Sequence, residues 1–63
     1  MVSERVCFLV IKHINGSRIE PIKVFERIAD ATNFVKARNK EDKVYYYSIE
    51  IVPMKYIDKD EIV

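Results

Sequence analysis

The residues best suited to covalent chemistry are Cys7 and His13, the only cysteine and the only histidine of the chain. A thiol beside an imidazole is the usual arrangement of an activated nucleophile and its base. The two residues lie in one apolar segment, which as an extended strand puts them on the same face but about 20 Å apart. They cannot form a catalytic pair within one chain. We expect Cys7 to be a small buried apolar residue and His13 to flank a turn at the surface.

Other catalytic and metal-binding arrangements lack the residues that they require. A metal site at His13 would need converging carboxylates, and Glu20 is the only acid near it in the predicted sheet. A phosphate-binding loop needs a glycine-rich run, whereas the sequence has one glycine. A pair of catalytic acids needs a cleft that so small a domain hardly provides. We therefore expect a protein that is not an enzyme and carries no cofactor or metal.

Length and composition limit the chain to one small domain. It has 63 residues and a mass of 7.5 kDa, and its apolar fraction of 49% is too high for a disordered chain. A core of this size is marginally stable, so self-association or a partner would stabilise the domain. The net charge of +1 creates no long-range field that would attract nucleic acid.

The sequence predicts a cytoplasmic protein without membrane contact. The longest apolar run, Val6–Ile11, is far too short to cross a bilayer. The first residues, Met1–Arg5, show neither the basic flank nor the apolar stretch of a signal peptide. A single cysteine also excludes an intramolecular disulfide framework.

Changes in hydrophobic period predict three strands and one helix. Asn15-Gly16 is a strong hairpin signal between the first two strands. The first strand is apolar on both parities, as central strands are, whereas Pro21 places the second strand at a sheet edge. The expected elements are strands over Arg5–Ile14 and Arg18–Phe25, a helix over Glu26–Arg38 and a third strand over Lys43–Val52.

This order of elements predicts an α+β fold of the type β-β-α-β. A three-stranded antiparallel sheet of order 2-1-3 carries one helix on one face. Residues 1–54 form the single domain, and residues 55–63 form a C-terminal tail or a short edge strand.

The hairpin register decides which face of the sheet the helix covers, and two registers are open. A two-residue turn at Asn15-Gly16 gives a core face of Cys7, Leu9, Ile11, Ile22 and Val24. A three-residue turn gives a core face of Val6, Phe8, Val10, Ile22 and Val24. We favour the two-residue turn, and expect a core that includes Leu9, Ile22, Ile28, Val35 and Ile49.

With the two-residue turn, the second sheet face is an apolar patch that one helix leaves uncovered. Such a patch usually marks an interface. The third strand is also a candidate edge for pairing with another chain. We therefore expect a protein-binding module, coupled to homodimerisation, with an interface formed by Phe8, Val10, Phe25, Val44 and Tyr46. In the alternative, the tail covers that face with Tyr56, Ile57, Ile62 and Val63.

A second function class is a small nucleic-acid-binding protein. Aromatic residues on a sheet face with a basic rim are typical of RNA-binding sheets, although the glycine-containing motif of those sheets is absent. The candidate residues are Lys36, Arg38, Lys40, Lys43 and Tyr46.

In size, in its balance of strands and helix and in its lack of catalytic groups, the chain resembles small single-domain phage proteins that take over host functions or block host defence. The resemblance implies an inhibitor or adaptor that binds a host protein of unknown identity, and it would place the protein in the host cytoplasm.

Overall fold

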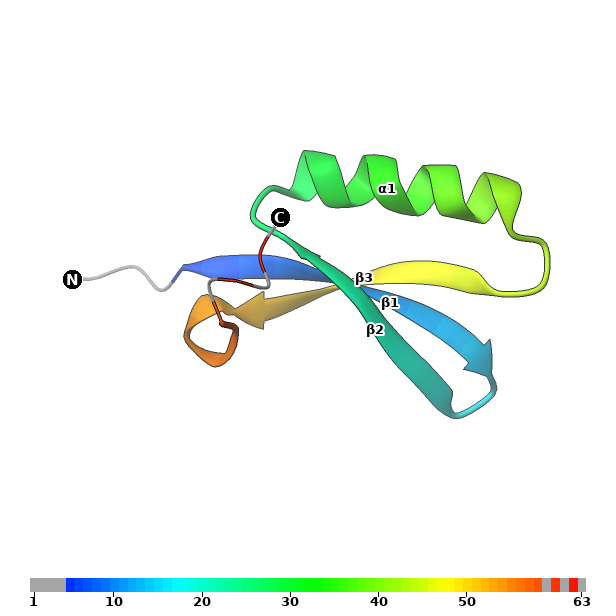
Figure 1. Cartoon of the computed structure of the whole chain (residues 1–63), viewed down its shortest axis with the longest axis horizontal. Helices are drawn as coiled ribbons and strands as arrows, with labels where there is room; N and C mark the ends of the chain where they lie inside the picture. Colours follow the sequence, from blue (N-terminus) through cyan, green and yellow to red (C-terminus); the bar gives the residue numbers. More distant parts are fainter. Residues whose placement is uncertain (1–4, 59, 61, 63) are drawn as a thin grey trace.

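The computed structural model describes residues 5–58, 60 and 62. Its elements are the strands β1 (Val6–Asn15), β2 (Arg18–Phe25) and β3 (Tyr46–Pro53), the helix α1 (Ile28–Glu41) and a short 3-10 turn over Met54–Tyr56. The strands form an antiparallel sheet in the order β2-β1-β3, and α1 lies across one face (Figure 1). The predicted α+β fold with β-β-α-β order is therefore confirmed. Among the described residues, no helix is both long enough and apolar enough to span a membrane.

The hairpin adopts neither of the two predicted registers along its full length. Its turn consists of Gly16 and Ser17, because Asn15 pairs with Arg18. The register then shifts twice, leaving Ile14 on β1 and Ile22 on β2 without a partner residue opposite. Beyond this β-bulge at Ile22, Val10 lies opposite Lys23, and Phe8 opposite Phe25.

The bulge places Phe25, and not Val24, on the same face of the sheet as Phe8 and Val10. The buried core consists of Val10, Phe25, Ala31 and Tyr47, with Phe8, Phe34, Val35 and Ile49 packed against it. The favoured two-residue register is thus wrong. Phe8, Val10 and Phe25, which it placed on the free face, lie in the core instead.

The predicted core is correct for Val35 on the helix and Ile49 on the third strand, which pack against the buried residues. It is wrong for Ile22 and Ile28, which are 38% and 56% exposed. Ile22 is turned outward because it is the extra residue of the bulge. Ile28 is the first residue of α1, at the margin of the packed surface. Leu9 is half-buried on the face opposite α1.

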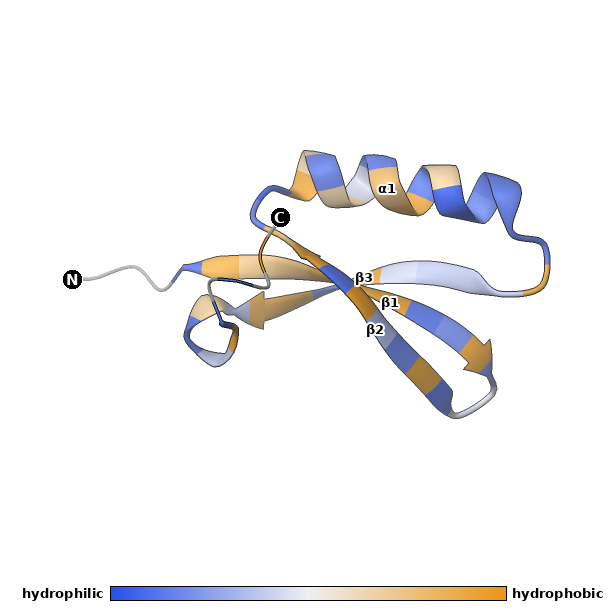
Figure 2. Ribbon diagram, in the orientation of Figure 1, coloured by the Kyte–Doolittle hydropathy of each residue, from blue (hydrophilic) through white to orange (hydrophobic). Residues whose placement is uncertain are grey.

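The second face of the sheet also has buried residues, Cys7, Ile11 and Val24. Near the C-terminus, Ile62 lies beside β2, where it forms one parallel bridge with Val24. Val63 lies outside the described residues. In contrast, β2 is exposed from Arg18 to Lys23, where the hairpin diverges from α1 and its residues alternate between hydrophilic and hydrophobic (Figure 2).

Candidate functional site

The outer edge of β3 is closed at one residue by a helix side chain. The N–H of Tyr47 donates to Oδ1 of Asn39 over 2.7 Å, and Nδ2 of Asn39 donates to the carbonyl oxygen of Tyr47 over 3.1 Å. In an antiparallel strand, the N–H and C=O of one residue point to the same side. Both groups of Tyr47 therefore point away from β1, and Asn39 occupies the position of a neighbouring strand.

Further along β3, the same alternation turns the N–H and C=O groups of Ile49 and Ile51 outward. β3 is a terminal strand of the sheet. Within the described part of the chain, no hydrogen bond reaches these outward groups. We call the segment Ile49–Ile51 the open β3 edge. Four backbone groups on two residues are thus available to another extended chain.

Asp42 fixes the start of the strand that carries this edge. Its Oδ1 accepts hydrogen bonds from the N–H groups of Val44 and Tyr45 at 2.9 and 3.0 Å. The hydroxyl of Tyr47 donates to its Oδ2 over 3.2 Å. These bonds hold the pKa of the Asp42 carboxyl below its ordinary value, the backbone donors contributing most. The nearby charge of Lys12 lowers this pKa further.

We predict that replacing Asp42 by asparagine weakens the acid dependence of folding. Because the pKa of Asp42 is lowered on folding, the ionised carboxylate stabilises the fold above its unfolded pKa, and this stabilisation is lost as pH falls through the folded pKa. Asp42→Asn should unfold at a lower temperature than the wild type at about pH 7, and should lose less stability between about pH 5 and pH 2. Thermal unfolding across this range measures both effects. The prediction would be contradicted if the unfolding temperatures of the two proteins fell by the same amount over the acid range.

The predicted interface residues are divided between two sides of the sheet. Phe8, Val10 and Phe25 pack under α1, as described above. Val44 and Tyr46 remain at the surface, 79% and 58% exposed. The five residues therefore do not form one continuous patch.

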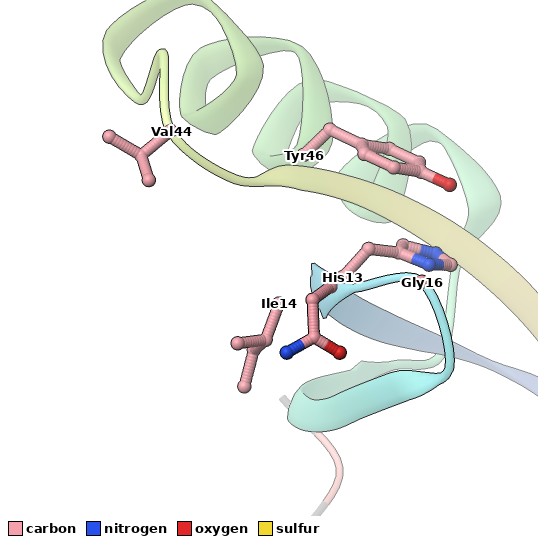
Figure 3. A pocket seen from close by; sticks show the side chains of 6 residues that line it. His13, Ile14, Gly16, Val44 and Tyr46 are labelled. Carbon is pink, nitrogen blue, oxygen red and sulfur yellow. The ribbon is translucent and has the colours of Figure 1, made fainter.

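Val44 and Tyr46 instead line a recess of about 270 Å³ with residues 13–16 of the hairpin (Figure 3). The rings of His13 and Tyr46 stack there in parallel, with centroids 4.2 Å apart. Nε2 of His13 lies 2.7 Å from Oγ of Ser48. This serine–histidine contact was missed from sequence because it depends on the β1–β3 register, which sets Tyr46 opposite His13.

A serine beside a histidine is part of a nucleophilic site, but the rest of such a site is absent from the described residues. No carboxylate there bonds to the other ring nitrogen of His13 to orient the base. The described residues also contain no group of three or more potential metal-ligating His, Cys, Asp or Glu side chains. The stacked pair and the contact with Ser48 connect β1 to β3.

The candidate nucleic-acid residues are not brought together either. Lys36 and Arg38 are two positions apart on α1, which separates their directions by about 200° of rotation. The guanidinium of Arg38 lies over the ring of Phe34, 5.0 Å from its centroid. Tyr46 stacks on His13 instead. Lys40 and Lys43 are exposed. Nucleic-acid binding stays a prediction. Lys36 and Arg38, two of its candidate residues, point to different sides of α1.

Comparison of the chain with protein-family models, with curated proteins and with solved structures finds no match. A proposal of function thus depends on the geometry of the open β3 edge.

Proposed function

We propose that this chain is a non-enzymatic protein-binding module that adds an extended segment of a partner protein to the open β3 edge. The observation that supports it is the outward direction of the backbone at Ile49 and Ile51, inferred from the two hydrogen bonds between Tyr47 and Asn39. Such strand addition derives affinity from main-chain hydrogen bonds and specificity from alternate side chains. An inhibitor or an adaptor could act in this way on a host protein.

The edge has the features that favour a strand as its ligand. Ile51 is 63% exposed, so a neighbouring strand would remove apolar surface from water. Soluble proteins usually protect long free edges, because such edges pair with other chains. Here Asn39 protects only the part at Tyr47 and leaves two residues open. An edge this short accepts one extended segment without inviting unlimited aggregation.

Replacing Ile51 by proline should weaken this binding while the domain stays folded. The N–H of Ile51 points away from β1, so proline removes a donor that the sheet itself does not use. Peptides are first selected on the wild type from a displayed library of random extended segments. Their affinity for Ile51→Pro should fall about 2- to 12-fold, because proline removes one hydrogen bond worth about 0.5–1.5 kcal/mol. Ile51→Val, which keeps the N–H, is the matched control and should bind nearly as the wild type does.

The location of bound peptide is checked by amide hydrogen exchange. Protection of the Ile49 and Ile51 amides on binding is expected. Selected peptides that bind Ile51→Pro as tightly as the wild type, or that protect other amides instead, would show that the open β3 edge is not the binding site. Circular dichroism of Ile51→Pro confirms that any loss of binding does not result from unfolding.

A further inference from the structure

One side of α1 faces the open β3 edge, and the direction of the Asn39 side chain shows which side this is. Because Asn39 bonds to the outer side of Tyr47, its direction on the helix points toward that edge. At about 100° per residue, Thr32 and Ile28 lie within about 20° of Asn39 around the helix axis. Phe34, in contrast, points to the opposite flank, where its ring contacts that of Phe25 at 5.4 Å. The flank of α1 above the open β3 edge is thus formed by Ile28, Thr32 and Asn39.

Ile28 of this flank lies at the level of Ile51. The helix and β3 run in opposite directions (Figure 1), starting from the contact between Asn39 and Tyr47. From Asn39 back to Ile28 the helix covers about 16 Å. From Tyr47 forward to Ile51 the strand covers about 13 Å. Both isoleucines are more than half exposed, at 56% and 63%. Both therefore offer exposed apolar surface at this end of the domain, Ile28 on the helix and Ile51 on the strand with the free backbone.

The opposite face of the same edge carries a negative charge. Glu50 is exposed and lies opposite Leu9, on the side of the sheet away from α1. Within the described residues its carboxylate has no ion-pair partner, the observed pair being Arg5 with Glu26. In an antiparallel partner strand, the residue opposite Glu50 would belong to a pair without mutual hydrogen bonds. Such pairs bring the Cα atoms to about 4.5 Å and the side chains closest together.

We infer that the partner segment is an antiparallel strand that alternates apolar and basic residues, with apolar side chains beside Ile28 and Ile51 and a lysine or arginine opposite Glu50. This inference rests on the proposed strand addition. The apolar side chains complete the surface between α1 and β3. The basic side chain pairs with a carboxylate that has no ion-pair partner among the described residues, and opposite charges stabilise directly opposed cross-strand pairs.

A second copy of this chain fits the same edge less well. If Ile49 pairs with Ile51 of the copy, the two-fold axis passes between the strands at Glu50. Two carboxylates would then lie directly opposite each other, an arrangement that destabilises a sheet. The charge of Glu50 therefore favours a basic segment of another protein over self-pairing.

The test compares three synthetic peptides of one length in a common threonine-rich background. Their central residues are Val-Lys-Val, Val-Glu-Val and Thr-Lys-Thr. The wild type should bind the first peptide about tenfold more tightly than the second, and Glu50→Lys should reverse this order. Ile28→Ser should weaken binding of the Val-Lys-Val peptide and leave that of the Thr-Lys-Thr peptide nearly unchanged. Fluorescence anisotropy gives the affinities, and hydrogen exchange of the Ile49 and Ile51 amides locates each peptide.

The possible outcomes separate this inference from strand addition itself. If all three peptides protect the Ile49 and Ile51 amides with equal affinity, strand addition stands and the chemistry of the partner is wrong. If no peptide protects these amides, both are wrong. If sedimentation shows a wild-type dimer that Ile51→Pro dissociates, the occupant is a second copy, and the basic partner is excluded.

Discussion

Phe25→Ala should unfold the domain, whereas Ile22→Ala should leave it folded. Phe25 is 7% exposed and belongs to the core, where its ring meets that of Phe34. Removing a buried phenylalanine side chain costs about 3–5 kcal/mol. The total free energy of unfolding of a small domain is about 5–15 kcal/mol, and a chain of this length belongs at the low end. Ile22 is the exposed residue of the bulge, so its truncation should cost less than about 1 kcal/mol.

Urea unfolding followed by circular dichroism measures both variants. The contrast also tests the register of the hairpin in solution, because the two-residue turn would place Ile22 in the core and Phe25 on the free face. An unfolded Ile22→Ala beside a folded Phe25→Ala would mean that the bulge is absent.

The second large effect is expected for Asn39→Ala, which removes both hydrogen bonds to Tyr47. At 0.5–1.5 kcal/mol for each bond, the free energy of unfolding should fall by about 1–3 kcal/mol. The variant should also bind strand-forming peptides or itself more tightly, because the open β3 edge then extends to Tyr47. Asn33→Ala is the matched control, since Asn33 is an exposed asparagine within the same helix.

Equal stability of the Asn39 and Asn33 variants would show that Asn39 does not hold the edge in solution. Urea unfolding gives the difference in stability. Sedimentation at several concentrations reports any new self-association of Asn39→Ala, which the Asn33 variant should lack.

The topology could be predicted from sequence because several independent signals agree. An apolar first strand indicates a central position, and Pro21 indicates an edge strand. The helix was predicted within a few residues, although it continues through Asn39 to Glu41 instead of ending near Arg38. Asn39 lies just beyond the predicted helix end, and its side chain bonds the backbone of another element. Such a contact depends on how α1 packs over β3, which no local pattern encodes.

The face of the sheet under the helix could not be predicted, for a physical reason. The first strand is apolar on both parities, so either face could form the core, and a shift by one residue exchanges them. The Asn15-Gly16 signal usually indicates a turn with positive φ angles. No described residue, Gly16 included, has a positive φ, and the turn lies one residue later. With the bulge at Ile22, this difference placed Phe8 in the core instead of at the surface.

Because Cys7 is buried, the reaction of its thiol with a labelling reagent reports local opening of the sheet. The side chain is fully buried, and its thiol donates to the carbonyl oxygen of Val52 over 3.4 Å. Burial also raises the pKa of this thiol, so little thiolate is present to react. Since the sequence has no other cysteine, labelling by a thiol reagent occurs at this one position. The labelling rate therefore reports the openings of the fold that expose Cys7, and a ligand that stabilises the sheet would slow it.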